Sequence, residues 1–142
     1  MNRVQSYREL EVYKAAFDLS MRIFTVSKTW PSEERYALTD QVRRASRSVG
    51  ANLAEAWAKR RYEAHFVSKL TDADAENNET EHWLCTAHAC GYVEKTELDA
   101  LIDRNRRIGG MLGRTIANAS SFVPSSDRPT VQPSHGPTEP PQ

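Results

Sequence analysis

Two clusters of cations in one stretch of the chain are the residues best suited to chemistry: Arg43, Arg44, Arg47, Lys59, Arg60 and Arg61. Exposed cations that form a patch contact phosphate groups, and a guanidinium can grip a phosphate with two donors at once. The pattern therefore predicts nucleic-acid contacts for five of them: Arg43, Arg47, Lys59, Arg60 and Arg61. The alternative is a solvated face that forms ion pairs with acidic residues of the following helix or of a neighbouring subunit: Asp72, Asp74, Glu76 and Glu79.

A second group of residues has types that could serve metal or thiol chemistry. Glu79-x-x-His82 has the spacing by which bundle helices offer a carboxylate and an imidazole to iron, but a di-iron site needs two such pairs. His82, Cys85 and His88 could offer ligands to zinc, yet a fourth ligand is not evident. Cys85 and Cys90 lie about 140° apart around a helix and cannot form a disulfide there. We expect no metal and no cofactor.

Catalytic motifs are missing from the sequence. It has no Walker loop, no Gly-x-Ser-x-Gly and no His-Glu-x-x-His. Ser46 and Ser48 near Arg44 could imitate a nucleophile beside a cation, but no base lies at a workable spacing. We therefore expect that the protein is not an enzyme.

The distribution of charge says more than the total. The 142 residues carry 19 basic and 19 acidic side chains. Residues 1–61 hold 12 basic and 7 acidic residues, and residues 62–91 hold 1 basic and 6 acidic residues. A basic second helix beside an acidic third can be complementary within the fold, which is an alternative to binding an external polyanion. The length suits one domain.

The arginines lie on a helix that we expect over residues 35–60. Its apolar stripe recurs every three or four residues: Leu38, Val42, Ala45, Val49, Leu53 and Ala56. Asn52 lies at the edge of this stripe. Arg44 and Glu55 line one flank, and we expect them to pair across a subunit interface.

Three further helices are expected, over residues 7–28, 62–90 and 94–119. The inward positions of the first should be Leu10, Tyr13, Phe17, Met21 and Phe24. Gly91 is a credible end for the third helix. Short connections between helices of this length predict an all-α, up-down-up-down antiparallel four-helix bundle over residues 1–119.

Polar residues occupy inward positions of the last two helices. Asn77, Thr80 and Asn105 all fall on the seams. A structural polar layer that fixes the register of the helices is the leading interpretation, because buried amides must find partners. An interior ligand or ion pathway and a subunit interface remain alternatives. Glycines in the fourth helix suit close approach of another backbone: Gly109, Gly110 and Gly113.

The last part of the chain differs in composition. Residues 120–142 are rich in proline and serine and nearly free of large apolar side chains, so we expect a disordered tail. There is no run of 18 apolar residues and no apolar region near the N-terminus. We therefore expect a cytoplasmic protein without a membrane segment.

Three segments of the chain stand out: YRELEVYKAA, WPSEERYALTDQVRRASRSVGANLAEAWAKR and HFVSKLTDADAENNETEHWLCTAHACGYV. Together they resemble a known family of four-helix bundles, the proteins encoded in intervening sequences of bacterial large-subunit ribosomal RNA genes. Asn52-Leu53-Ala54-Glu55-Ala56 is similar to the family's Asn-Ile-Ala-Glu-Gly. Gln41-Val42-Arg43-Arg44 is similar to its Gln-Leu-Arg-Arg, and Cys90-Gly91-Tyr92 to its Leu-Gly-Tyr. Ala56 replaces the usual glycine and Gly50 a common proline.

The resemblance implies a homopentameric, barrel-like assembly without an established activity. A related group, the accessory variability proteins of diversity-generating retroelements, partners a reverse transcriptase and RNA. This chain lacks their strongly basic balance. The resemblance implies a non-catalytic homo-oligomer that partners a reverse transcriptase, and the basic patch on the second helix predicts that it binds RNA or another nucleic acid. The alternative is a protein–protein interaction or scaffold module with no nucleic-acid role.

Overall fold

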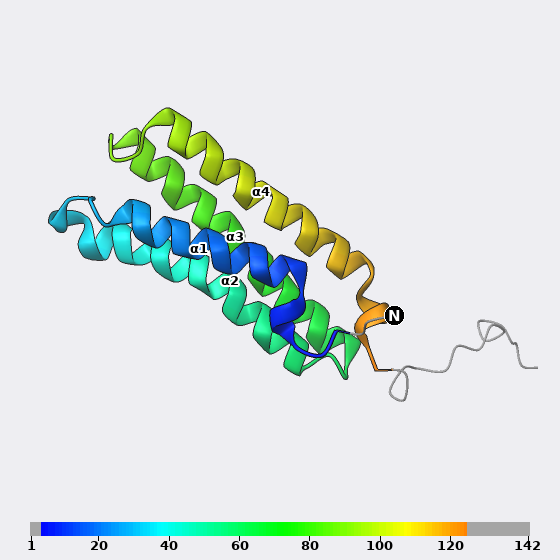
Figure 1. The fold of residues 1–142 in the computed structure, drawn as a ribbon. Coiled ribbons are helices and arrows are strands. Elements are labelled where there is room, and N and C mark those ends of the chain that lie inside the picture. The colour runs from blue at the N-terminus through cyan, green and yellow to red at the C-terminus, as the bar shows by residue number, and fades with distance from the viewer. Residues whose placement is uncertain (1–3, 125–142) are drawn as a thin grey trace, which may run out of the picture.

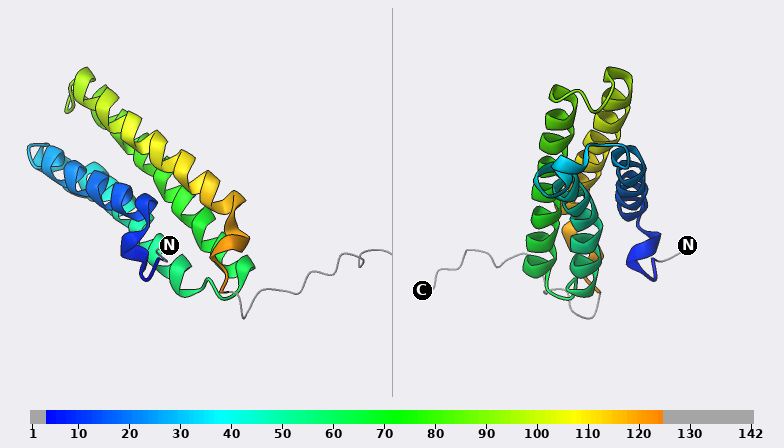
Figure 2. Two further views of the ribbon diagram at one scale, coloured as in Figure 1. Left: turned by 45° about the vertical axis from the view of Figure 1, so that its right-hand side comes forward. Right: turned by 90° about the vertical axis from the view of Figure 1, so that its left-hand side faces the viewer.

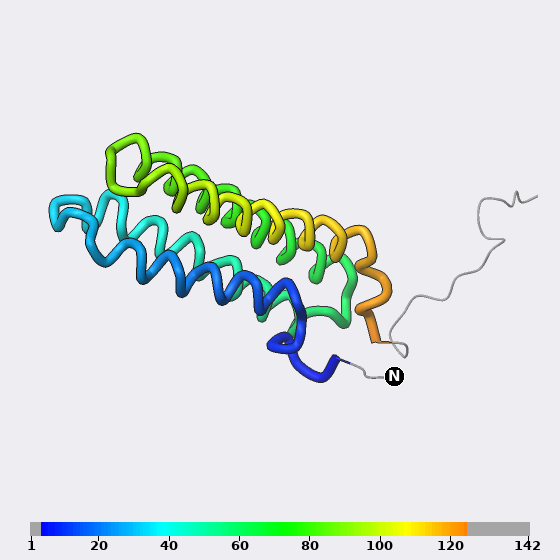
Figure 3. Tube along the Cα trace, turned by 45° about the horizontal axis from the view of Figure 1, so that its top comes forward, coloured from blue at the N-terminus to red at the C-terminus, as the bar shows by residue number. Residues whose placement is uncertain are grey.

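The structure, a computed structural model, describes residues 4–124 and consists of helices and their connections, with no strand in that part of the chain. The four main helices are α1 (Glu11–Ser27), α2 (Asp40–Ala58), α3 (Glu63–Ala89) and α4 (Lys95–Ala117). The all-α prediction is confirmed. Figures 1 and 3 show that successive helices run in opposite directions, as expected for an up-down-up-down bundle.

The helices form two antiparallel hairpins that pack against each other. One hairpin contains α1 and α2 and the other contains α3 and α4, and the two are seen as separate pairs in the left view of Figure 2. Contacts between α2 and α3 and between α1 and α4 join the hairpins. The connection from α1 to α2 and the connection from α3 to α4 lie at the same end of the molecule (Figure 1).

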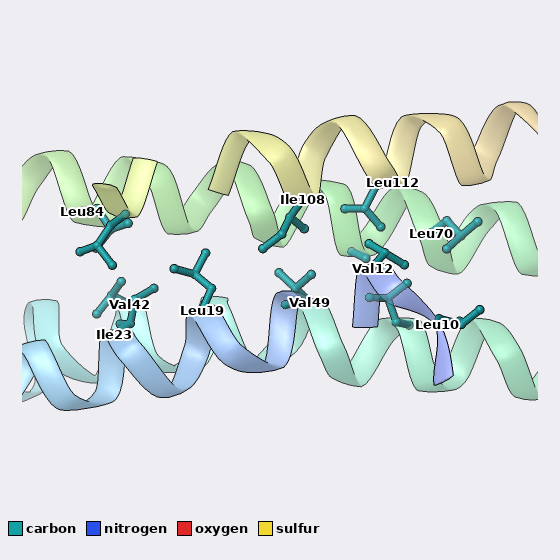
Figure 4. Packing of buried hydrophobic residues seen from close by; sticks show 14 of the residues in the cluster. Leu10, Val12, Leu19, Ile23, Val42, Val49, Leu70, Leu84, Ile108 and Leu112 are labelled. Atoms are coloured by element: carbon teal, nitrogen blue, oxygen red, sulfur yellow. The ribbon is translucent and has the colours of Figure 1, made fainter. Parts of the chain in front are cut away.

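All four helices contribute to the core. Figure 4 shows side chains from the two hairpins pointing toward one another across the centre of the bundle. The labelled residues that are at most 2% exposed are Leu19, Ile23, Val42, Val49, Leu70, Leu84, Ile108 and Leu112. Burial of one such side chain stabilises the fold by about 1.5–3 kcal/mol relative to leaving it exposed.

Leu10 is buried as expected, but the rest of the predicted inward face of the first helix is wrong. The structure buries Val12, Ala16, Leu19 and Ile23, while Phe17 remains 48% and Met21 44% exposed. The helix carries two apolar stripes at the same three-and-four spacing, displaced by about 100° around its axis. The smaller aliphatic side chains fit between the facing helices, and the aromatic stripe faces outward.

The first helix begins later than expected, whereas the second begins at Arg35 as expected. Ser6 caps a short 3₁₀ turn, Tyr7–Glu9, by accepting a hydrogen bond from the N–H of Arg8 at 3.2 Å. Leu10 is then extended, with φ −69° and ψ 130°, so α1 starts only at Glu11. The second helix opens with a π-helical turn, Arg35–Thr39, ahead of α2.

The bundle continues past residue 119, where the sequence suggested that the tail begins. A 3₁₀ turn, Ala119–Phe122, follows α4. The Phe122 ring lies 5.4 Å from that of Phe66 on α3, and Val123 is 2% exposed. Residues up to 124 therefore belong to the folded unit, because these apolar side chains pack on it. The rest of the expected tail, 125–142, lies outside the described residues.

Gly91 ends α3 in the way its position suggested. Its φ is +85°, a left-handed conformation that glycine adopts without strain. Its N–H donates to the carbonyl of His88 at 2.9 Å, and the N–H of Tyr92 donates to the carbonyl of Ala87 at 2.9 Å. These two bonds form a Schellman motif and turn the chain toward α4.

Among residues 4–124, no backbone of another helix approaches the glycines of α4 closely. A Cβ atom on Gly109 would lie 3.5 Å from the side-chain nitrogen of Asn77, and one on Gly110 would lie 3.6 Å from Arg114 of its own helix. One on Gly113 would meet nothing within 4 Å. Close approach is therefore wrong for the described part of the bundle, and close approach across subunits stays a prediction.

Candidate nucleic-acid interface

Cations from two helices surround one phenyl ring at the closed end of the first hairpin. The Phe24 ring of α1 has Arg43 at 4.7 Å, Lys28 at 4.8 Å and Arg47 at 5.5 Å from its centroid. Such distances allow cation–π attraction. We call these residues, together with Arg44, the Phe24 cluster.

Arg43 is fixed in place by α1. Its Nε donates to the hydroxyl of Ser27 at 2.8 Å, and a terminal nitrogen lies 3.4 Å from the carbonyl oxygen of Phe24. The side chain is half-buried, whereas Arg44 and Arg47 are exposed. One guanidinium of the cluster is therefore preorganised, which lowers the entropic cost of binding an anion.

Carboxylates do not neutralise this cluster within the described chain. Arg43, Arg44 and Arg47 form no ion pair with a described acidic residue. Burial and then Glu79 raise the pKa of Glu76, and the charge of Arg44 opposes this effect. The ion pairs that the alternative interpretation required between the arginines and the acidic third helix are therefore missing inside the subunit.

The cluster opens onto a groove along α1 and α2. Its lining residues are Phe24, Asp40, Arg43, Arg44, Arg47, Ser48 and Ala51. One carboxylate, Asp40, lies among the three arginines. Arg47 and Ala51 also line a neighbouring groove whose walls include Tyr13, Phe17 and Met21. A charged surface thus continues into an apolar one along the same hairpin.

The remaining predicted cations lie at the other end of α2. Lys59 is exposed, and Arg60 stacks its guanidinium 3.9 Å from the Trp57 ring while donating to the Trp57 carbonyl at 2.9 Å. Arg61 lies 6.0 Å from the ring of Tyr62. We call Trp57, Lys59, Arg60, Arg61, Tyr62 and His65 the α2–α3 corner.

The structure therefore divides the five predicted nucleic-acid residues into two sites. Arg43 and Arg60 are separated by about 25 Å along a helix. Sequence reasoning missed Lys28 and assigned Phe24 to the core. Finding them required the register of the first hairpin, which places the end of α1 beside the start of α2.

Glu55 and Asn52 both have partners inside the subunit. Glu55 forms an ion pair with Lys69 of α3 at 2.8 Å, and the hydrogen bond and charge of Lys69 lower the pKa of Glu55. Glu55 is thus paired inside the subunit, and its pairing with Arg44 across a subunit interface stays a prediction. The side-chain nitrogen of Asn52 donates to the Ser48 carbonyl of its own helix at 2.9 Å.

Asn77 and Asn105 meet in the seam between α3 and α4. The amide of Asn77 donates to the backbone carbonyl of Asn105 at 2.9 Å. The amide of Asn105 donates to the backbone carbonyl and the side-chain oxygen of Asn77, both at 3.1 Å. Both residues are at most 3% exposed. This reciprocal pair fixes the register of the two helices, because a shifted register would leave buried amides unpaired.

The metal-ligand candidates do not converge. Within residues 4–124 no group of three or more His, Cys, Asp and Glu side chains is placed to hold an ion. Glu79 instead accepts a hydrogen bond from the Trp83 indole at 3.0 Å, and both cysteines are exposed with free thiols. None of the helices in the described part of the chain is long and apolar enough to cross a membrane.

Comparisons with known proteins place this fold in a family. A crystal structure of a protein of unknown function from the S23 ribosomal protein family of Bacteroides thetaiotaomicron superposes with a TM-score of 0.68. The two are 27% identical, and the match covers 75% of this chain and 95% of that one. No curated protein matches the chain. The family model described as 23S rRNA-intervening sequence protein matches residues 8–114, and the chain therefore belongs to this family.

Proposed function

We propose that this protein is a non-catalytic accessory protein that binds RNA through phosphate contacts made by the Phe24 cluster. The observation that carries the proposal is that Lys28, Arg43 and Arg47 surround the Phe24 ring and Arg44 lines the same groove. None of these four cations forms an ion pair with a described carboxylate. Cations without such partners attract phosphates with little competition from the protein itself.

The proposal extends to assembly. The resemblance to the family's pentamers favours a homo-oligomer, and five copies of a modest cationic patch would bind one RNA with avidity. A nucleic-acid enzyme such as a reverse transcriptase is the proposed protein partner, by analogy with the related accessory proteins. The cluster then serves to hold RNA beside that enzyme.

The test compares two matched pairs of arginines in the full chain. Arg43 and Arg47 belong to the Phe24 cluster, whereas Arg106 and Arg107 of α4 pair with Glu81 and Asp103. We expect the double change to glutamine at Arg43 and Arg47 to weaken binding of a labelled RNA duplex at low salt about tenfold or more, as judged by fluorescence anisotropy. The same change at the α4 pair should have little effect. Equal losses in both variants would contradict the proposal.

One observation favours the alternative, a protein-interaction module. Phe17 and Met21 are 48% and 44% exposed on α1 and line an apolar groove with Tyr13. Contiguous exposed apolar surface marks protein interfaces. If this face joins subunits, Phe17→Ser with Met21→Ser should lower the mass measured by light scattering at micromolar protein and leave the helix content unchanged. An unaltered mass would remove this face from the assembly.

A further inference from the structure

The α2–α3 corner exposes an aromatic ring that the turn itself does not use. Tyr62 is 59% exposed. Its backbone N–H donates to the carbonyl of Lys59 at 3.1 Å, and its carbonyl accepts from the N–H groups of His65 and Phe66, both at 3.0 Å. Its side chain makes no capping hydrogen bond at the start of α3. The backbone therefore builds the turn, and the phenol ring is presented to the surroundings.

The neighbours of this ring suit an anionic aromatic ligand. The imidazole of His65 lies 5.6 Å from the Tyr62 ring at an interplanar angle of 59°, and the guanidinium of Arg61 lies 6.0 Å from it. From residue 59 to residue 65 the sequence KRRYEAH carries three basic residues and one acidic residue. Lys59, Glu63 and His65 are all exposed, so the ring is surrounded by polar groups rather than by an apolar patch.

The second aromatic ring of the corner, that of Trp57, is already stacked against a cation of the same chain. The Trp57 ring carries the Arg60 guanidinium at 3.9 Å, and the same guanidinium is hydrogen-bonded to the Trp57 carbonyl. Arg60 is thus held at the end of α2. Its remaining N–H donors can bind a phosphate with little further loss of conformational entropy. The corner combines one fixed cation, one exposed lysine and one exposed aromatic ring.

We propose that the α2–α3 corner binds an unpaired nucleotide, with its base stacked on Tyr62 and the adjoining phosphates contacted by Lys59 and Arg60. This rests on the proposed RNA-binding function and names its substrate class, RNA that carries a single-stranded segment. Bases in a duplex are already stacked on each other, whereas unpaired bases are free to stack on aromatic side chains. Positive charge beside the ring favours RNA over a protein partner, which would meet little apolar surface there.

The Phe24 cluster and the α2–α3 corner lie near opposite ends of α2 and have different roles in this proposal. The Phe24 cluster places its cations around a ring and offers them to phosphates of any RNA. The corner lies about 25 Å further along α2 and adds a ring that only an unpaired base can use. An RNA duplex that ends in a single-stranded extension can contact both sites.

The experiment uses two RNA probes and the full-length protein. One probe is a short blunt-ended duplex, and the other is the same duplex with a single-stranded uridine extension of about ten nucleotides. Tyr62→Leu keeps the bulk of the side chain and removes its aromatic face, while Tyr62→Phe keeps the ring and removes only the hydroxyl. Circular dichroism checks that each variant retains its helix content.

The stacking contact predicts a selective loss. Tyr62→Leu should bind the extended RNA about fivefold to tenfold more weakly than the wild type, while its affinity for the blunt duplex stays the same. Tyr62→Phe should bind both probes as the wild type does. Arg43→Gln with Arg47→Gln should lower the affinity for both probes.

Other outcomes separate the two proposals. If Tyr62→Leu binds the extended RNA as well as the wild type does, or loses affinity equally for both probes, the corner does not stack a base, and the Phe24 cluster is judged by its own variants. If the wild type binds neither probe at low salt, both proposals are wrong. If the corner instead binds a protein, Tyr62→Leu will not change the affinity for either RNA probe, and this result overturns the nucleotide site.

Discussion

The seam between α3 and α4 differs sharply from the outer side of the α1–α2 hairpin. In the seam, Asn77 and Asn105 satisfy each other's amides, and their side chains are at most 3% exposed. On the outer side of the first hairpin, Phe17 and Met21 face outward and the arginines of the Phe24 cluster lack described carboxylate partners. One region is closed by its own contacts, and the other offers exposed apolar side chains and arginines that form no ion pair with a described carboxylate.

The difference indicates which residues stabilise the fold and which are available for binding. Buried groups that are paired contribute to the folding equilibrium, so changing them should be costly. Exposed rings and cations contribute little to that equilibrium, so changing them should alter binding instead. Matched substitutions in the two regions can separate these effects.

The largest contrast is expected between Leu112 and Phe17. Leu112 is fully buried, so Leu112→Ala should lower the free energy of unfolding by about 2–5 kcal/mol. Phe17→Ala should lower it by less than about 1 kcal/mol in the separated subunit, because half of the side chain is exposed. Urea titrations of both variants give the comparison. Similar losses of unfolding free energy in the two variants would show that Leu112 and Phe17 contribute equally to folding. A loss for Phe17→Ala that rises with protein concentration would show that Phe17 is buried between subunits.

A smaller effect is expected in the polar pair. Asn105→Ala leaves the backbone carbonyl and the side-chain oxygen of Asn77 without their donor and should cost about 1–3 kcal/mol. Asn78→Ala changes an exposed amide on the next position of α3 and serves as the control. Chemical denaturation of the two variants measures the difference. Equal stability of both variants would mean that the hydrogen bonds between Asn77 and Asn105 contribute no net stability to the fold.

The smallest effect concerns a contact between the two hairpins at their closed end. The hydroxyl of Tyr92 donates to the carboxylate of Glu34 at 2.7 Å. This hydrogen bond, followed by burial and the charge of Glu34, raises the pKa of Tyr92 to about 12. The neutral phenol is favoured in the folded state, so its stabilising effect is complete below the ordinary value of 10 and is lost as the pH rises from 10 toward 12.

Ultraviolet absorbance can detect that titration. In the folded protein the pKa of Tyr92 should be about 12 rather than the ordinary 10, and Tyr92→Phe should remove this late step. Unfolding the wild type in urea should also bring the late step back to the ordinary range. A late step that survives Tyr92→Phe would assign the shift to another residue.

The sequence predicted the buried residues correctly in helices whose hydrophobic spacing fits only one apolar stripe. Leu70, Leu84 and Leu112 lie on single stripes, and their burial followed from spacing alone. In α1 the same spacing fits two stripes, and the larger aromatic residues suggested the wrong one. Only the distance between facing helices decides between Leu19 and Phe17, and that distance is a property of the assembled bundle.

The candidate site was less predictable than the fold. The arginines could be recognised as a group, but their division into two sites follows from how α2 ends beside α3 and begins beside α1. Lys28 and Phe24 join Arg43 only through the hairpin register. Pairing of Glu55 with Lys69 likewise depends on which residues of α2 and α3 face each other. These features are long-range contacts, which residue spacing within one helix does not determine.

The salt dependence of RNA binding tests the phosphate contacts of the Phe24 cluster most directly. The logarithm of the association constant for an RNA duplex should fall linearly as the logarithm of salt concentration rises. Changing Arg43 and Arg47 together to glutamine should make that slope shallower by about 1–2, since removing one cation from a phosphate reduces it by about 1. Binding that is absent at low salt, or a slope that is the same in the wild type and the double variant, would contradict phosphate contact by this cluster.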